Sequence, residues 1–307
     1  MFRAIVRIAL FVSSAVLVEQ HSTLLSAGPV VLTPNKLAVA ILMALAMAQL
    51  LVAPRRFPGS AKNVCIIVLA VSSGISMTAA VLAGTPIGVL APAVGQYVTA
   101  MVFYFSLAFL IRDQKDLAFV FWGLVIGAGA ISWTSILGIG WVVESSAWGY
   151  RAGGLGGNPG RLVYCSTAAL PIALLLFVRS GRILSKGVIV AAIAMIFVGI
   201  FAAKSRSSLV VLLVMGAFWM IRLRRFDLLR YAPIAIALVA AFYFMMPQGF
   251  ADRMSTMSSA KSLQQDGSWQ GRIADYQHAL QALATSPITG IGLYRFGIWV
   301  NEEIDWR

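Results

Sequence analysis

A short polar segment between two long apolar runs contains the residue types of an anion-binding site. It reads AKSRSS, and its cations are Lys204 and Arg206. Ser205 is a plausible N-cap for the apolar helix that follows, whose free backbone N–H groups and positive dipole end would face the same point. An arginine in the first turn of a helix opposes that dipole, at a cost of roughly a few tenths of a kcal/mol, unless an anion binds there. Because the planar guanidinium of Arg206 matches phosphate oxygens, the segment predicts a phosphate-binding site.

A second candidate segment, residues 150–165, is rich in glycine and reads YRAGGLGGNPGRLVYC. Asn158 followed by Pro159 is typical of an N-cap and a first helical residue, so another helix is expected to begin there. The glycines would let the backbone approach a ligand closely, with Arg151 and Arg161 on either side. The segment is not a P-loop, which needs GK[ST], nor a dinucleotide fingerprint, which needs a preceding strand. It is either part of an anion site or a flexible loop between two helices.

A third segment, near the end of the chain, reads DGSWQGRIADYQHALQALATSPITGIGLYRFG. Ser268 can cap a helix over residues 269–285 that carries Arg272, with a proline beyond its end. An apolar stripe repeats along this helix with a period of about 3.6 residues. The stripe consists of Trp269, Ile273, Tyr276, Leu280 and Leu283. We expect it to pack on the apolar part of the chain, and we interpret His278, on the polar side, as a bystander rather than a catalyst.

The elements that must position these segments are those of a membrane protein. Of the 307 residues, 60% are hydrophobic and 11% are charged, whereas soluble domains carry about 25% charged residues. The apolar residues form runs of roughly 16 to 25, long enough to cross a membrane as helices, and they lack the period-two alternation of barrel strands. We therefore predict an all-α fold, a polytopic integral membrane helix bundle. The net charge of +13 is attributed to membrane topology, and no nucleic acid partner is expected.

Nine spans are expected before a more polar tail. They cover residues 5–25, 35–53, 64–83, 89–111, 117–142, 160–178, 187–203, 207–221 and 231–246. The first could also be a secretory signal, since arginines precede its apolar core, but it lacks a clean cleavage site and an uncleaved helix is preferred. The sequence thus predicts a transmembrane bundle over residues 1–246 and a helical segment over residues 247–307 that is incomplete at its C-terminal end.

The orientation follows from the lysines and arginines in the short loops. One set of loops holds fourteen, namely Arg3, Arg7, Arg55, Arg56, Lys62, Arg112, Lys115, Arg179, Arg182, Lys186, Arg222, Arg224, Arg225 and Arg230. The opposite set holds five, namely Lys36, Arg151, Arg161, Lys204 and Arg206. The richer side is cytoplasmic, so the N-terminus is expected inside and residues 247–307 outside, in the periplasm of a bacterial cell. The few outward cations either snorkel individually to lipid headgroups or together form an anion-binding surface.

These three segments, in this order, resemble the O-antigen ligase and polymerase superfamily of bacterial glycan transferases. The resemblance spans about residues 150–297, while the earlier helices agree only in hydropathy. It implies a donor glycan on undecaprenyl pyrophosphate and an acceptor that is lipid A–core or another lipid-linked glycan. It also implies a reaction at the periplasmic face of the inner membrane, among membrane lipids, without a metal, a nucleotide sugar or another cofactor. The absence of CxxC and HExxH spacings agrees with that expectation.

The resemblance also assigns roles to individual residues. Arg206 in the SR-type motif and Arg272 in GRIADYQHAL correspond to arginines that bind the pyrophosphate in that family. Preorganised guanidinium groups would stabilise the negative charge that develops on a diphosphate leaving group. Lys204, Arg161, Arg151 and Ser205 are expected to support substrate binding.

One departure from the family keeps other functions open. The family has a later His, usually followed by Asn, that acts on the acceptor, and this sequence ends at Arg307 without a match. We therefore expect either a fragment or a truncated chain that does not turn over. The alternatives are a polymerase of the same superfamily, a non-catalytic membrane subunit, and a transporter of lipids or solutes. A transporter is disfavoured, because no inverted repeat and no acidic residue deep in a span is found.

Overall fold

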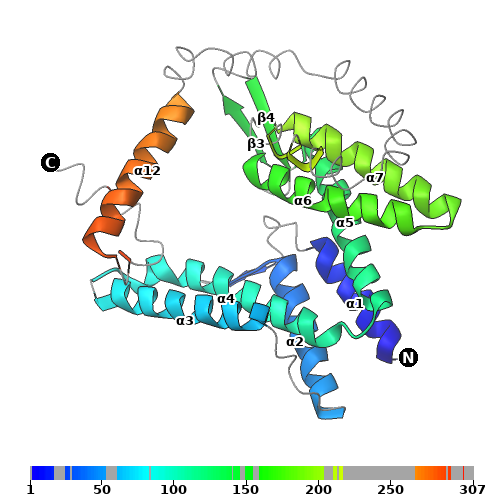
Figure 1. The fold of residues 1–307 in the computed structure, drawn as a ribbon, viewed down its shortest axis with the longest axis horizontal. Helices are drawn as coiled ribbons and strands as arrows, with labels where there is room; N and C mark the ends of the chain where they lie inside the picture. Colours follow the sequence, from blue (N-terminus) through cyan, green and yellow to red (C-terminus); the bar gives the residue numbers. More distant parts are fainter. Residues whose placement is uncertain are drawn as a thin grey trace. The chain divides into compact units, whose positions relative to one another are not determined.

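The computed structural model describes the chain in segments that together contain twelve helices and strands. The described residues are 2–16, 25–27, 30–52, 61–82, 84–139, 141–145, 149–154, 159–203, 210–212, 214–216, 267–287, 290–291 and 300. The helices are α1 (Phe2–Val16), α2 (Pro34–Val52), α3 (Ala61–Leu82), α4 (Ile87–Leu110), α5 (Gln114–Ile136), α6 (Pro159–Arg179), α7 (Ile183–Ala202) and α12 (Gly267–Thr285). The strands are β1 (Leu25–Ala27), β2 (Val30–Leu32), β3 (Trp141–Ser145) and β4 (Gly149–Gly154). The predicted helical membrane fold is thereby confirmed (Figure 1).

Four of the described helices are long and apolar enough to cross a membrane. They are α2, α5, residues Leu162–Arg179 of α6, and α7. Shorter apolar stretches of α3 and α4 cover Ile66–Leu82 and Val94–Leu110. Seven expected spans therefore correspond to α1–α7, residues 207–221 are described only in part, and residues 231–246 lie outside the described residues.

The first expected span, residues 5–25, is confirmed only in part. Helix α1 covers Phe2–Val16, and Leu25–Ala27 forms a strand that pairs antiparallel with Val30–Leu32. Residues 17–24 lie outside the described residues.

The fifth expected span ends early, and a second hairpin follows it. Gly138 has a φ of 69°, and its N–H donates to the carbonyl of Ser135, as in the left-handed endings that terminate many helices. Strands β3 and β4 then pair antiparallel, with Val143 opposite Arg151. The sequence had suggested either a helix end or a loop here, so the hairpin is a correction. Its physical basis is the β-branched pair Val142–Val143, which fits a pleated strand.

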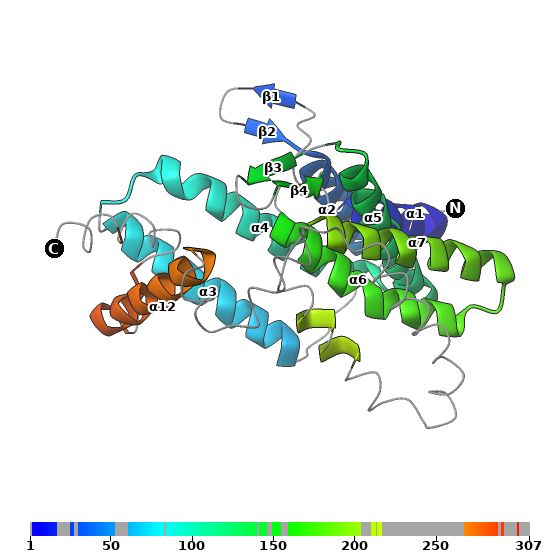
Figure 2. The same cartoon turned by 90° about the horizontal axis from the view of Figure 1, so that it is seen from above.

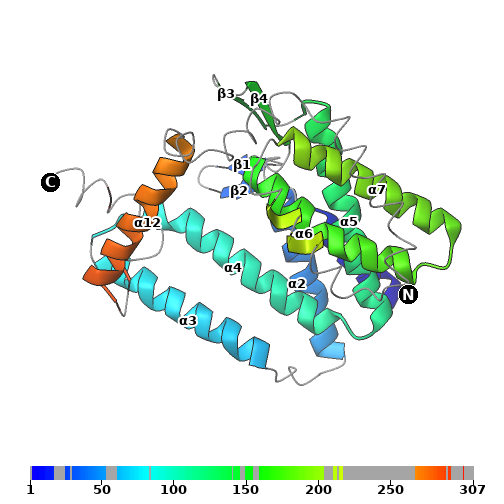
Figure 3. The ribbon, with the colours of Figure 1, turned by 45° about the horizontal axis from the view of Figure 1, so that its top comes forward.

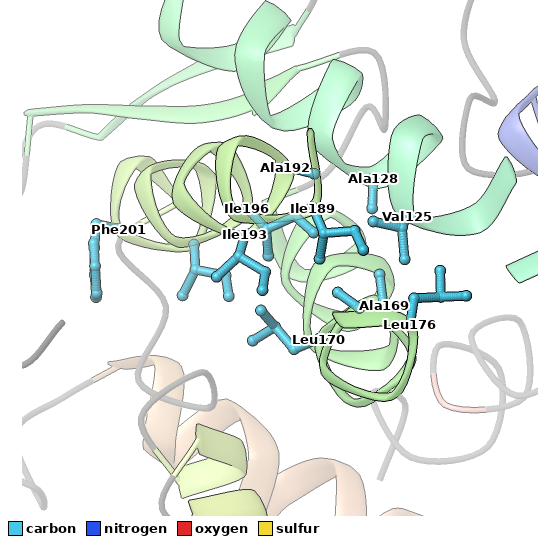
Figure 4. Packing of buried hydrophobic residues seen from close by; sticks show 12 residues of the cluster. Val125, Ala128, Ala169, Leu170, Leu176, Ile189, Ala192, Ile193, Ile196 and Phe201 are labelled. Carbon is cyan, nitrogen blue, oxygen red and sulfur yellow. The ribbon is translucent and has the colours of Figure 1, made fainter. Parts of the chain in front are cut away.

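Helix α5 is at the centre of the bundle and packs against α1, α6 and α7. Figure 2 shows α6 and α7 running side by side along it. Its buried residues Val125 and Ala128 meet apolar side chains from both of those helices (Figure 4). The buried partners are Ala169, Leu170, Ala173 and Leu176 of α6 with Ile189, Ala192, Ile193, Ile196, Ile200 and Phe201 of α7. In lipid, this close packing takes the place of the hydrophobic effect as the main force between helices.

Glycines in α5 bring α1 unusually close. A Cβ on Gly123 or on Gly127 would collide with the backbone of α1, at Phe11 and Ala15 respectively. The two glycines form a GxxxG motif, the small-residue pattern that lets helix backbones approach in membranes. On another side of α5, a Cβ on Gly199 of α7 would lie 2.5 Å from the Cβ of Ser132.

An ion-pair cluster joins the beginnings of α1 and α5. The carboxylate of Asp116 is fully buried and accepts from Arg3 Nη1 at 3.0 Å and Arg7 Nε at 2.8 Å. Arg7 also donates to the more exposed Asp113 at 3.1 Å. Asp113 caps α5 by accepting from the backbone N–H of Asp116 at 2.7 Å. The two helices therefore start at the same end of the bundle and run in the same direction.

The chain divides into two compact units. The first contains Met1–Leu45 and Leu110–Ser258, and the second contains Ala46–Phe109 and Ser259–Arg307. The bundle of α1, α5, α6 and α7 belongs to the first unit, and α3, α4 and α12 belong to the second. The predicted division at residue 247 stays a prediction.

Candidate functional site

Three elements of the first unit meet at the end of the bundle opposite the ion-pair cluster. Helix α5 ends there, α6 begins there after the β3–β4 hairpin, and strand β4 packs against α5, α6 and α7 (Figure 3). The hydroxyls of Ser132 and Ser166 hydrogen-bond across α5 and α6 at 3.2 Å. Close to them, Leu162, Val163 and Ala203 form a buried cluster with Ile131. The beginning of α6 and the end of α7 therefore lie together.

Two of the predicted substrate-binding residues belong to these elements. Arg161 is the third residue of α6, which begins at Pro159 as the sequence predicted. Arg151 lies in β4, opposite Val143. An arginine in the first turn of α6 is repelled by the positive dipole end of that helix. The placement of this arginine is favourable only if an anion or another acceptor compensates the two positive charges. The hairpin thus holds one cation-bearing strand against a helix N-terminus that carries a second cation.

The AKSRSS segment leaves the bundle at the same place. Helix α7 ends at Ala202, and the N–H of the following residue, Ala203, donates to the Gly199 carbonyl at 3.0 Å. Ala203 is fully buried in the cluster with Leu162. Because Leu162 follows Arg161 and Ala203 precedes Lys204, the structure brings the backbone at the start of AKSRSS next to the beginning of α6.

The remaining residues of that segment lie outside the described residues. These are residues 204–208, so the predicted roles of Lys204, Ser205 and Arg206 stay predictions. The chain is again helical at 210–212 and 214–216, in agreement with the expected span over residues 207–221.

Arg272, the second predicted pyrophosphate ligand, lies on α12 in the second unit. Helix α12 covers Gly267–Thr285, close to the predicted range, but it starts before Ser268, which therefore lies inside the first turn rather than at the N-cap. The side chain of Arg272 is exposed, and that of His278 is half-buried. An exposed guanidinium keeps its five donors available for a substrate.

Among the described residues, the apolar stripe of α12 stays largely exposed, so the expectation that it packs on the apolar part of the chain is not confirmed. Its members are 41–73% exposed, whereas Ala282, on the opposite side of the helix, is only 7% exposed. The helix therefore turns its small and polar side inward and its apolar side outward. Sequence periodicity identified the stripe, but it could not say what covers the stripe.

Sequence reasoning missed the carboxylate that organises the other end of the bundle. Two signals were available: Arg3 and Arg7 are four residues apart, so they share one helix face, and Asp116 is the acidic residue in the first turn of α5. Among the described residues, no group of three or more His, Cys, Asp or Glu side chains could hold a metal ion. The expectation of metal-independent chemistry is not tested by that observation.

Comparison with known protein families finds a match in the later part of the chain. Residues 190–306 match the family model described as O-Antigen ligase. The matched range includes both arginine motifs, AKSRSS and GRIADYQHAL, but not the glycine-rich segment before α6. The resemblance to the O-antigen ligase superfamily is thereby confirmed.

Two other comparisons found no relatives. No curated protein and no solved structure matches the chain. The family match and the apolar helices identify an integral membrane protein and support a general role in glycan transfer during lipopolysaccharide or polysaccharide biosynthesis, with glycan and lipid substrates.

Proposed function

We propose that this protein transfers a glycan from undecaprenyl pyrophosphate to lipid A–core, as an O-antigen ligase, at the periplasmic face of the inner membrane. Arg206 and Arg272 bind the pyrophosphate. Lys204, Ser205, Arg161 and Arg151 assist in holding the donor. The same chemistry with a second lipid-linked glycan as acceptor would make the protein a polymerase.

The observation that carries the proposal is the buried cluster that Leu162 and Ala203 share, in a chain whose residues 190–306 match the O-antigen ligase family model. Leu162 follows Arg161, and Ala203 is the first residue of AKSRSS, so this cluster supports a site that draws on both segments. Cations from both segments together with a helix N-terminus would favour a polyanion over a neutral ligand. A diphosphate is the polyanion that the family's donor class would present there.

The distribution of charge supports the proposed topology. The described cations near the opposite end of the bundle are Arg3, Arg7, Arg112, Lys115, Arg179, Arg182 and Lys186. That end is assigned to the cytoplasm, because positively charged loops are retained there. The N-terminus is then cytoplasmic, and the β3–β4 hairpin, the AKSRSS segment and residues 247–307 face the periplasm.

The proposed reaction is a substitution at the anomeric carbon of the donor sugar. A hydroxyl oxygen of the acceptor forms a bond to this carbon, the bond to the pyrophosphate oxygen breaks, and the hydroxyl proton is released. Negative charge develops on the departing undecaprenyl pyrophosphate as the bond breaks. Guanidinium groups of Arg206 and Arg272 would stabilise that charge more strongly than the charge of the bound donor, which lowers the barrier.

The first prediction is that Arg206→Ala or Arg272→Ala lowers transfer at least about 100-fold, the usual effect of removing one preorganised donor to a developing anion. The measurement is transfer of a labelled glycan from undecaprenyl pyrophosphate by the purified full chain in lipid vesicles. Lipid A–core and a lipid-linked glycan are supplied as acceptors in separate reactions, which distinguishes a ligase from a polymerase.

Arg179→Ala is the matched control, since Arg179 is an exposed arginine at the opposite end of the bundle. Its rate is expected to stay within about twofold of the wild type, and all variants should insert into membranes equally. Wild-type transfer by either Arg206→Ala or Arg272→Ala would contradict the assignment. A wild-type chain that transfers to neither acceptor would contradict the proposed function itself.

A further inference from the structure

Helix α12 presents an apolar face that stays largely exposed among the described residues. The exposed fractions along its stripe are 43% for Trp269, 41% for Ile273, 73% for Tyr276, 67% for Leu280 and 57% for Leu283. A single exposed apolar residue is ordinary, whereas a continuous stripe of five large ones marks a surface that binds something apolar.

The stripe is narrow and runs along most of the helix. With 3.6 residues per turn, its five members fall within an arc of about 80°, and the 14 steps from Trp269 to Leu283 span about 21 Å. The covered side is the opposite one, where Ala282 is buried and His278 is half-buried. Because the stripe is straight, a flat apolar surface that runs parallel to the helix axis could contact all five of its side chains.

The end of α12 is placed against a helix of the apolar part of the same unit. The helical hydrogen bonds continue from Ser286 N–H to the Ala282 carbonyl and from Gly290 N–H to the Ser286 carbonyl. A Cβ on Gly290 would lie 3.8 Å from Ser76 Oγ on α3. Ser76 is six residues before Leu82, the last residue of α3. Six residues correspond to a distance of about 9 Å along the helix axis.

Helix α3 itself indicates what surrounds this region. Four of its large side chains, Ile67, Val68, Val71 and Ile75, are 51–60% exposed. Within a helix that is apolar over Ile66–Leu82, such exposure is expected of a lipid-facing surface. Since Ser76 follows Ile75, the segment after α12 touches α3 near the level at which its lipid-facing side approaches the membrane surface.

We propose that α12 is an interfacial helix that lies along the membrane surface at the Leu82 end of α3. Its stripe is inserted among phospholipid acyl chains just below the headgroups. Trp269 and Tyr276 suit this depth, because each has a large apolar ring with one polar group. The amphipathic pattern, with an apolar stripe and Gln, Asp and Arg elsewhere, is that of helices that bind in the plane of a bilayer.

One consequence concerns Arg272 and rests on the function proposed above. By helical spacing, Arg272 lies about 60° from the centre of the stripe, at its edge. A long side chain at that position would reach the level of the lipid phosphates while the stripe remains in the acyl region. That is also the depth at which the pyrophosphate of a polyprenyl-linked donor would lie.

The test is the environment of spin labels along α12 in the full chain reconstituted in phospholipid vesicles. Cys65→Ser and Cys165→Ser provide the background. Labels are attached at Tyr276→Cys and Leu280→Cys on the stripe and at Gln277→Cys and Gln281→Cys beside it. All four side chains are exposed, so the labels should leave the fold unchanged.

Collisions with oxygen, which concentrates in lipid, and with a water-soluble nickel complex then report the surroundings. We expect oxygen to relax the stripe labels at least about threefold more than the nickel complex does, and the reverse at the glutamine positions. Stripe labels reached by neither reagent would mean that protein covers the stripe, and stripe labels reached mainly by nickel would mean that it faces water. Either result overturns the proposal.

A second pair of variants keeps the test independent of the labels. Tyr276→Lys with Leu280→Lys is compared with Gln277→Lys with Gln281→Lys, which adds the same charge outside the stripe. With the other seven tryptophans replaced by phenylalanine, quenching of Trp269 by brominated lipids is expected to fall at least about twofold in the first variant only. Equal quenching in both variants would contradict lipid insertion of α12. Neither readout requires glycan transfer, so these results and those for the proposed function can fail separately.

Discussion

At the scale of single residues, the most constrained group in the bundle is the carboxylate of Asp116. It is fully buried, yet it accepts hydrogen bonds from two guanidinium groups and from the backbone N–H of Arg112 at 3.0 Å. A buried charge with such partners is tolerated, whereas the same charge with one partner removed is strongly destabilising. Arg3 and Arg7 thus attach α1 to α5, and under the proposed topology they would also contribute to membrane orientation.

This pairing gives a prediction about stability. Asp116→Asn removes the negative charge and places amide N–H groups against the guanidinium groups, so the free energy of unfolding should fall by about 2 kcal/mol, between the values for exposed and fully buried ion pairs. The measurement is the thermal unfolding midpoint in detergent. Asp113→Asn is the control, because Asn retains the capping oxygen and the Asp113 side chain is 50% exposed. Equal midpoints for the two variants would argue against a structural role of Asp116.

At the scale of elements, α5 organises the bundle because small residues on its different sides let two other helices, α1 and α7, pack closely against it. Gly123 and Gly127 face α1, and Ser132 faces Gly199 of α7. Large side chains at these positions would hold the helices apart and lose the dispersion contacts on which association in lipid depends. Helix α6, which carries Arg161, and helix α7, which ends at Ala202, both pack on α5, so its small residues also determine how the beginning of α6 and the end of α7 are placed.

The matching prediction is that Gly127→Ala destabilises the bundle by about 1–3 kcal/mol, the usual cost of overpacking. The added methyl group would overlap the backbone of Ala15, which cannot move without displacing α1. Gly74→Ala, in α3, is the control, since no atom lies within 4 Å of its new Cβ. Thermal unfolding of the two variants in the same detergent compares them. A midpoint for Gly127→Ala as high as that of Gly74→Ala would mean that the α1–α5 contact is looser than described.

At the scale of the whole molecule, the two ends of the first unit differ in charge and in construction. One end has the ion-pair cluster and most of the described cations, and the other has the β3–β4 hairpin and the starting points of the predicted anion site. An asymmetric distribution of lysine and arginine orients membrane proteins during insertion. Under the proposed topology, the same asymmetry leaves few cations on the periplasmic side, where a concentrated group would bind an anionic substrate.

This topology can be checked with single cysteines in the Cys65→Ser, Cys165→Ser background. Gln281→Cys on α12 should react with a membrane-impermeant maleimide added to intact spheroplasts, because residues 247–307 are proposed to be periplasmic. Lys115→Cys, an exposed position in the first turn of α5, should react only after the membrane is permeabilised. Labelling in the opposite pattern would invert the orientation and place the candidate site in the cytoplasm.

Composition and periodicity by themselves determined the class of this protein and most of its helices. Apolar runs of membrane length predicted helices that match α2–α7 closely, because a backbone in lipid must satisfy its hydrogen bonds internally. Helix boundaries predicted from single residues were also accurate. Helix α6 begins at Pro159, as the Asn-Pro pair predicted, and α12 covers almost the predicted range. The arginine motifs pointed to the family that residues 190–306 match.

Only the tertiary structure decided which of these parts meet and which surfaces remain open. Contacts between residues far apart in the chain produce two of these features. They are the buried cluster that holds Leu162 and Ala203, and the pairing of Arg3 and Arg7 with Asp116. A third feature, the exposure of the α12 stripe, also depends on the tertiary structure. Hydrophobic periodicity specifies that one side of a helix prefers an apolar environment, but protein and lipid satisfy that preference equally well. For this reason the sequence could locate the stripe of α12, and only the structure could show that it stays largely exposed among the described residues.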